Sequence, residues 1–155
     1  MILHDASDIV RIVTTTTAGI DVLACWADQT TTAFTPGETV TKITTATTTT
    51  VVASPGASTQ RQVKILIIRN IHASTSNVVT VEFFDGTNAA AVYSRTLAAG
   101  ESVVFNGVSW QLFNSVGVPV TQANSSPVDV QAFTSAGASS WTKPTSFSPL
   151  GVEVI

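Results

Sequence analysis

β-Branched residues dominate this sequence and limit the folds that are open to it. Threonine alone accounts for 25 of the 155 residues, and valine and isoleucine supply most of the larger apolar side chains. Branching at Cβ restricts a side chain in a helix and suits a pleated strand, so this composition favours β-structure. Apolar residues at helical spacing are nearly absent. The sequence therefore predicts an all-β fold.

Turn residues divide the chain into eight or nine short segments of strand type. Strands at this spacing are typical of an antiparallel β-sandwich, and we expect a jelly-roll-like version with a mostly irregular C-terminal arm. The expected strands are Ile9–Thr16, Ile20–Ala27, Val40–Val52, Gln62–Ile71, Val78–Phe84, Ala90–Leu97, Ser102–Phe105 and Ser109–Phe113.

The residues between these strands predict how they connect. Ala18-Gly19 is read as a hairpin turn, and Pro36-Gly37 as the turn that leads into Val40–Val52. Within that threonine-rich segment, Thr47–Thr50 is either a strand with its hydroxyls outward or a bend. Tight turns are expected at Asp85-Gly86, Ala99-Gly100 and Asn106-Gly107, the last being the strongest hairpin signal.

Two strands carry a prediction about burial. Alternation places Ile20, Val22, Ala24 and Trp26 on one face of their strand. Gln62–Ile71 is a nearly continuous apolar run, which predicts a strand that is buried on both faces.

Composition changes after Gly117, and this change sets the expected domain organisation. Residues 1–117 hold the strands and are read as the sandwich domain, and the polar residues 118–130 as a linker. Residues 131–155 are too few for a core of their own, because an independent domain needs about 40 residues. We expect this C-terminal arm to dock on the main domain or on a partner chain, or to stay undocked.

Charged side chains are scarce: seven basic and ten acidic residues make up 11% of the chain and give a net charge of −3. This balance predicts no basic surface for nucleic acid or an anionic membrane, and no stretch reaches the ~18 apolar residues of a membrane span. Cys25 stands alone, which excludes an internal disulfide. Strand edges with few charges are prone to self-pairing, so we expect a homo-oligomer.

Titratable residues offer few candidates for catalysis. His4, Asp5 and Asp8 suggest a metal or acid–base cluster, but neighbours on an extended chain face opposite ways, so we read this segment as an exposed N-terminal arm without a signal peptide. His72 is read as a residue that caps its own turn. Glu82 and Asp85 resemble a carboxylate pair, although a strand end shaped by Asp85 is favoured. We predict no enzyme activity, no cofactor and no metal.

Aromatic residues suggest contacts with a partner. Trp26 and Trp110 alternate with apolar neighbours and are read as core or interface residues. Trp141 lies in a segment that cannot bury it alone, and burial of a large aromatic side chain contributes roughly 1.5–3 kcal/mol. We therefore expect Trp141, Phe133 and Phe147 to anchor the arm on a partner. Carbohydrate binding through exposed aromatic rings is an alternative.

Two passages resemble phage virion proteins. The first joins Arg61–Asn70, His72–Ser76 and Val78–Val81 with Leu97–Ser102 and Gly107–Trp110, and resembles the N-terminal β-sandwich modules of head decoration proteins, head fibres and some tail fibres. It covers roughly residues 30–117. The second, Phe133–Pro144 followed by Val152–Ile155, resembles the entry to glycine-rich fibre regions, and this sequence ends where the glycine run of that family begins.

The resemblance implies a non-enzymatic protein of the virion. A capsid decoration protein or the capsid-proximal base of a head fibre is favoured, synthesised in the bacterial host cytoplasm and placed on the capsid surface. It also implies a trimer, a major capsid protein or another virion protein as partner, and a C-terminal arm that begins a fibre module. A tail-fibre or baseplate attachment domain, and a carbohydrate-binding module for host glycans, remain the alternatives.

Overall fold

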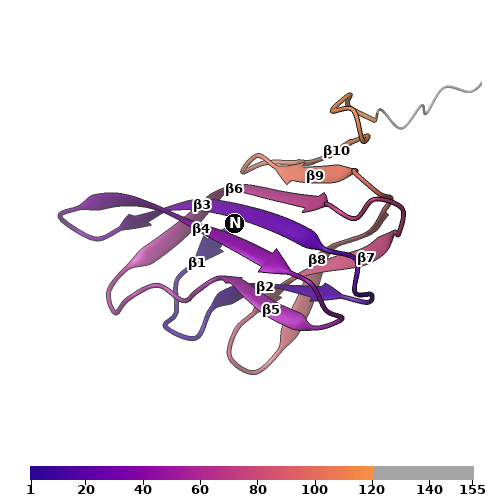
Figure 1. The fold of residues 1–155 in the computed structure, drawn as a ribbon. Coiled ribbons are helices and arrows are strands. Elements are labelled where there is room, and N and C mark those ends of the chain that lie inside the picture. The colour runs from indigo at the N-terminus through magenta and orange to yellow at the C-terminus, as the bar shows by residue number, and fades with distance from the viewer. Residues whose placement is uncertain (121–155) are drawn as a thin grey trace, which may run out of the picture. The chain divides into compact units, whose positions relative to one another are not determined.

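Two antiparallel sheets pack face to face in the computed structural model, which describes residues 1–120 (Figure 1). The expected arm at residues 131–155, with Phe133, Trp141 and Phe147, lies outside the described residues, as does the expected linker beyond Val120. The strands are β1 (Ile2–Leu3), β2 (Ile9–Thr14), β3 (Ile20–Gln29), β4 (Phe34–Ile43), β5 (Thr48–Val52), β6 (Gln60–Asn70), β7 (Asn77–Phe84), β8 (Ala89–Leu97), β9 (Ser102–Phe105) and β10 (Trp110–Phe113).

The predicted antiparallel β-sandwich is confirmed. Sheet A has the order β10-β9-β6-β3-β4, with β1 also paired to β6, and sheet B has the order β5-β2-β7-β8. Side chains alternate between the core and solvent: in β2, Val10, Ile12 and Thr14 are buried while the residues between them are half-buried. Among residues 1–120 no helix is long and apolar enough to cross a membrane.

The strands pair as two nested units, each with an inner and an outer pair of strands. In the first unit β3 pairs with β4, and β2 and β5 pair with each other outside them. In the second unit β7 pairs with β8, and β6 pairs with β9. The inner pair of the first unit lies in sheet A and that of the second in sheet B. Pairing of β3 with β6 and of β2 with β7 joins the two units.

The predicted hairpin at Ala18-Gly19 is wrong. β2 and β3 belong to different sheets, so this connection crosses from one sheet to the other. The side chain of Asn77 holds the crossing, because its amide donates to the Thr16 and Ala18 carbonyls and accepts from the Thr15 and Thr16 N–H groups. Only long-range contacts of this kind distinguish a crossing from a hairpin.

The predicted turn at Pro36-Gly37 is also wrong, because both residues lie inside β4, opposite Ala27 and Trp26. The turn lies earlier, where the Thr30 N–H donates to the Ala33 carbonyl. β4 is an edge strand, the position in a sheet that tolerates proline. The expected segment Val40–Val52 is divided by a bend at residues 44–47, so the open question about Thr47–Thr50 is resolved as a strand that begins at Thr48.

The apolar run of β6 predicted burial on both faces, and this prediction is wrong. β6 is buried on one face only. Val63, Leu66 and Ile68 point into the core, while Ile65 is 40% exposed and Ile67 half-buried on the outer face. The register shifts between Cys25, which lies opposite Ile65, and Trp26, which lies opposite Val63. The predicted face of β3 is confirmed, with Ile20, Val22 and Ala24 buried and Trp26 packed against the core.

The three tight turns predicted in the second half are confirmed. Asp85 and Asn106 each begin a turn and accept hydrogen bonds from the N–H groups two and three residues later. Gly86 and Gly107 follow them with φ of 92°, a conformation that side chains disfavour. A third turn at Ala98–Glu101 includes Ala99-Gly100 and closes through the Glu101 N–H and the Ala98 carbonyl.

Candidate functional site

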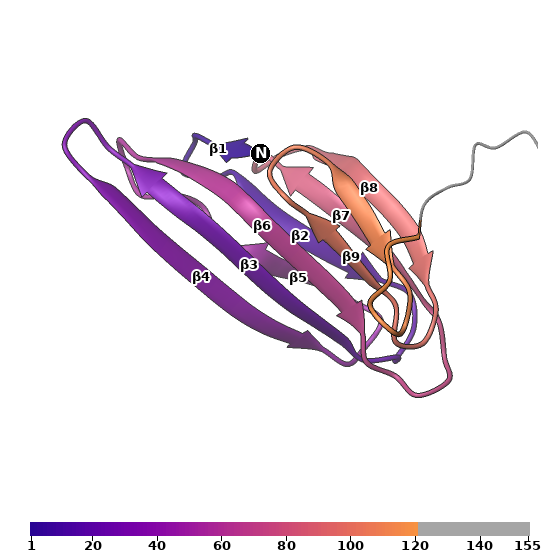
Figure 2. The same cartoon turned by 90° about the horizontal axis from the view of Figure 1, so that it is seen from above.

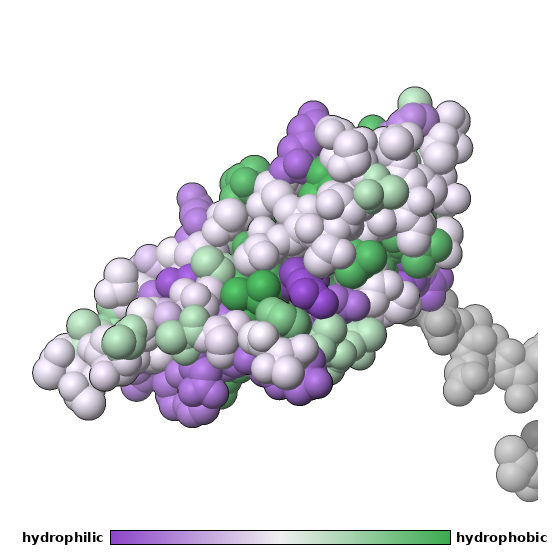
Figure 3. All heavy atoms as spheres, turned by 90° about the horizontal axis from the view of Figure 1, so that it is seen from below, coloured by the Kyte–Doolittle hydropathy of each residue, from purple (hydrophilic) through white to green (hydrophobic). Residues whose placement is uncertain are grey.

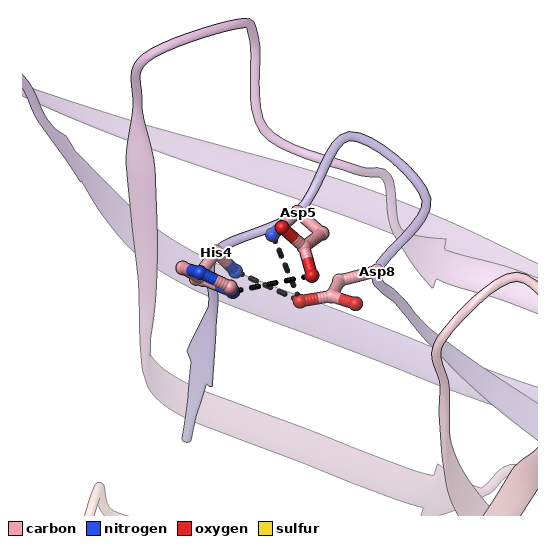
Figure 4. A group of neighbouring side chains, drawn as sticks. All are labelled: His4, Asp5 and Asp8. Atoms are coloured by element: carbon pink, nitrogen blue, oxygen red, sulfur yellow. Dashed lines mark hydrogen bonds and ion pairs between the residues drawn. The ribbon is translucent and has the colours of Figure 1, made fainter.

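The cluster of His4, Asp5 and Asp8 lies in the connection between β1 and β2 (Figure 4). Their possible metal-ligating atoms all lie within 4.8 Å of one another. The reading of an extended arm is therefore wrong, although the side chains of His4 and Asp5 are exposed as predicted. Leu3 is fully buried, and β1 pairs with the start of β6.

Asp8 explains why this segment is folded. Its carboxylate is buried, and Oδ2 accepts hydrogen bonds from the His4 N–H at 2.9 Å and the Asp5 N–H at 3.0 Å. The Asp8 N–H in turn donates to the Asp5 carbonyl. Nδ1 of His4 lies 3.4 Å from Oδ2 of Asp5, and both side chains are exposed. These bonds close a turn and account for the buried carboxylate without an ion.

The other titratable candidates act within the fold. Nδ1 of His72 accepts hydrogen bonds from the Ser74 and Thr75 N–H groups, which confirms the predicted turn cap. Glu82 pairs with Arg11, with 2.8 Å between Oε2 and Nε, on the outer face of sheet B. The backbone N–H groups of Asn88 and Thr87 lower the pKa of Asp85. The predicted role of Asp85 at a strand end is confirmed.

Trp26 and Trp110 both pack against the core, as predicted. Trp110 stacks on Tyr93, with 4.4 Å between ring centroids, and contacts Phe105. Burial there raises the pKa of Tyr93. The Arg61 guanidinium lies 4.6 Å from the centroid of Trp26, and a Cβ at Gly37 would lie 2.9 Å from that ring. Both rings are therefore engaged by their neighbours.

Arg61 joins Trp26 to a partly buried ion pair. Its Nε and Nη2 donate to the two carboxylate oxygens of Asp28 at 2.7 and 2.8 Å, and Nη1 donates to the Ala53 carbonyl. Hydrogen bonding from Arg61 is the main cause that lowers the pKa of Asp28. This two-pronged contact ties β3 to β6 and to the connection that precedes β6.

An open pocket of about 390 Å³ lies beside the N-terminal turn, where three connections meet. Its lining combines one imidazole with uncharged amides and hydroxyls, groups that both donate and accept hydrogen bonds. Such a lining suits a neutral polar ligand. The residues are His4, Gln29, Thr30, Thr31, Ser58, Thr59 and Gln60.

The outer face of sheet A carries an apolar row across four strands, which we define as Val40, Leu23, Ile67 and Val104. Strand register places these residues side by side in that order. Val40 is 77% exposed, and the other three are half-buried. Cys25 and Ile65 extend the apolar surface toward the next row. Sequence reasoning missed this surface because it placed Ile65 and Ile67 in the core; Lys64 and Arg69 in the same run were the available signal.

Charged residues border the apolar row. Lys42, Asp21 and Arg69 lie side by side on one side of it, and Glu38 lies on the other. An apolar centre inside a polar border is the usual arrangement of a protein–protein interface. Sheet B differs, since its outer face holds the Arg11–Glu82 pair and a hydrogen bond between the Thr80 and Ser94 hydroxyls. On the face seen in Figure 3 most residues have intermediate hydropathy and are drawn pale. Hydrophobic and hydrophilic residues are interspersed among them in small groups.

Comparison with known proteins gives no relative for this chain: no family model, curated protein or solved structure matches it. Within residues 1–120, every buried side-chain nitrogen or oxygen has a hydrogen-bond partner. In the described part of the chain, the apolar row and the polar pocket are surfaces that suit the binding of a partner or a ligand.

Proposed function

We propose that this chain is a non-enzymatic structural protein of a phage virion, either a capsid decoration protein or the capsid-proximal base of a head fibre. The apolar row on sheet A carries the proposal, because a continuous apolar surface with a charged border suits a face that another protein covers. The phage-like passages support it, since Arg61–Asn70 forms most of β6 at the centre of this sheet.

Binding of sheet A to its virion partner depends on shape complementarity and apolar contact more than on charge. The row crosses β4, β3, β6 and β9, so a partner can be contacted across most of the width of the sheet. A stable interface needs about 800 Å² from each partner, and apolar burial contributes about 25 cal/mol per Å². Lys42, Asp21 and Arg69 then orient the partner at the border.

Incorporation into particles tests this proposal. Ile65→Lys adds a charge to the apolar surface at a position that is already 40% exposed, and Val108→Lys adds one in the β9–β10 turn, where the valine is 91% exposed. A charge buried at an interface without a partner costs enough to weaken binding about tenfold or more. We expect mass spectrometry of purified particles to show that loss for Ile65→Lys and full incorporation for Val108→Lys. Equal incorporation of both variants would contradict attachment through this face.

Cryo-electron microscopy of intact particles tests the placement. Density for the sandwich on the head supports the decoration or head-fibre assignment. Density on the tail instead would replace it with the alternative of a tail-fibre or baseplate attachment domain.

The polar pocket favours a second candidate function, recognition of a host glycan. Its amides and hydroxyls are suited to sugar hydroxyl groups. A glycan array is expected to give binding that Gln29→Ala and Gln60→Ala abolish and that the control Gln111→Ala, on β10, retains. No binding by the unmodified chain would exclude this candidate.

A further inference from the structure

β4 is a long, open edge of sheet A. It has ten residues, ends the strand order and pairs only with β3 among the strands of residues 1–120. Figure 2 shows it along the border of its sheet. An unprotected edge of this length presents unpaired N–H and C=O groups to another chain.

The other sheet edges are shorter or protected. β5 has five residues and β10 four, and the Val120 N–H already donates to the Leu112 carbonyl of β10. β8 has nine residues, but its register shifts after Val81, and Arg95 lies opposite the buried Val79. Bulges and inward-facing charges discourage edge pairing. β4 is therefore the edge best suited to accept another strand.

The backbone polarity of β4 follows from two observations. The Thr30 N–H bonds to the Ala33 carbonyl at the turn, and hydrogen-bonded and non-hydrogen-bonded pairs alternate along an antiparallel ladder. Odd-numbered residues of β4 therefore bond to β3, and even-numbered residues turn their N–H and C=O groups to the open edge. Pro36 fits this pattern, because its missing N–H falls on the open side.

We propose that β4 pairs antiparallel with β4 of a second copy of this chain, about a twofold axis at Val40. This register places Val40 opposite its own copy and Glu38 opposite Lys42. All the N–H and C=O groups of Glu38, Val40 and Lys42 are then paired, which gives six hydrogen bonds between the two chains. Pro36 falls outside the paired segment, opposite Thr44.

Side-chain charge selects this register. The side chains of Glu38, Val40 and Lys42 share the outer face, so the twofold axis brings each glutamate beside a lysine of the other chain. On the opposite face, Thr39 meets Thr41. Opposite-charge and Thr–Thr pairs directly across an antiparallel ladder are both stabilising. The surface is thus complementary to itself, as an isologous contact requires.

The registers centred on Thr39 or Thr41 pair neither Glu38 nor Lys42 with an opposite charge, and those centred two residues from Val40 are unfavourable. Pairing centred on Glu38 sets two glutamates against each other and brings Pro36 opposite Val40, where a hydrogen bond is lost. Pairing centred on Lys42 sets two lysines against each other. Like charges directly opposite are destabilising. Only the register centred on Val40 pairs both charges.

This contact joins the apolar rows of two chains into one. Val40 ends the row in each copy, so the twofold axis continues it through the partner's Val40 to the far side of a single sheet. The inference rests on β4 alone and does not depend on the virion assignment. It predicts a dimer, whereas the resemblance to phage proteins had implied a trimer.

Charge exchange in the full-length chain tests the register. Glu38→Lys and Lys42→Glu each create like-charge pairs across the axis, so each variant is expected to self-associate about tenfold or more weakly than the wild type. An equimolar mixture of the two variants restores opposite charges and is expected to form a heterodimer. Light scattering after size exclusion measures the mass, with 16.1 kDa for one chain.

Backbone pairing is tested at Val40 itself. Val40→Pro removes an outward N–H and leaves the ladder to β3 intact, so it is expected to give a monomer, whereas Val40→Thr is expected to stay dimeric. In the wild type, exchange of the Glu38, Val40 and Lys42 amides is expected to slow as protein concentration rises.

Three results would overturn the inference. They are a wild-type monomer or trimer at tens of micromolar, charge variants that remain dimeric, and a mixture of the two charge variants that stays monomeric. Circular dichroism shows whether each variant is folded. Absence of the wild-type chain from purified particles, with the dimer intact, would count against the proposed function and not against this contact.

Discussion

Two asparagines are fully enclosed at the ends of the β6–β7 connection. The Asn70 amide donates to the Thr75 and Leu97 carbonyls, and its oxygen accepts from the His72 N–H. Asn77 makes four such bonds to the β2–β3 connection. Asparagine is otherwise costly to bury, so these side chains serve as substitutes for backbone pairing where strands end.

Asn77→Leu is therefore expected to be strongly destabilising. The substitution leaves the carbonyls of Thr16 and Ala18 and two N–H groups without their partner, which costs about 2–4 kcal/mol. Differential scanning calorimetry is expected to show a melting temperature lower by roughly 10 °C. Asn88→Ala, in the exposed β7–β8 turn, serves as the control and is expected to change it by less than about 2 °C. Similar values for the two variants would contradict this role.

The Asp28–Arg61 pair predicts a pH dependence. Hydrogen bonding from Arg61 lowers the pKa of Asp28 in the folded chain, so the unfolded chain binds the proton more readily. The stabilisation is complete above the unfolded-state pKa, near pH 4, and is lost as pH falls through the lower folded-state pKa. Asp28→Asn is expected to cost about 1 kcal/mol at pH 7 and less at pH 2.5. A difference between variant and wild type that does not change with pH would contradict this assignment.

At the scale of single elements, the two residues of β1 are expected to contribute very differently to the stability of the fold. Leu3 is fully buried and Ile2 is 52% exposed, although they are neighbours in the same short strand. Leu3→Ala is expected to lower the free energy of unfolding by about 2–4 kcal/mol, and Ile2→Ala by less than about 0.5 kcal/mol. Urea denaturation measures both. Equal effects would mean that β1 does not dock on β6.

Strand existence could be predicted from sequence because alternation and turn chemistry are local. The segments that became β7, β8, β9 and β10 were predicted nearly to the residue, with Asp85-Gly86 and Asn106-Gly107 between them. β1 was missed because Ile2 and Leu3 are too few to show a period. The Pro36-Gly37 turn was wrong because edge position, which makes proline acceptable, is set by the other strands.

The candidate surfaces were harder to predict than the strands. Ile65 and Ile67 look like core residues, and only the register with β3 and β9 shows that they share the outer face with Leu23 and Val104. The pocket joins His4 to residues more than 20 positions away in the sequence. Three-dimensional proximity of this kind has no signature in a single sequence.

At the scale of the whole molecule, the sandwich depends on pairings between distant parts of the chain. Ile9 pairs with Phe84, and Ile20 with Asn70. Long-range pairing slows folding, because loop closure costs entropy before the contacts form. Stopped-flow refolding is therefore expected to take milliseconds to seconds. Refolding within microseconds would contradict the view that folding depends on these long-range strand pairings.

The nested pairing also bears on durability. Each nested unit contributes two strands to each sheet, so neither sheet can be completed by one half of the chain, and neither half can leave without exposing the core of the other. Partial unfolding of one unit therefore has a high free-energy cost. Few partly open states are populated, so proteases have few sites to cleave. The lifetime of the folded state is set by the rate at which the β3–β6 and β2–β7 strand pairings open together. The durability of this fold is therefore kinetic: it depends on the unfolding rate and not on the stability of any one strand.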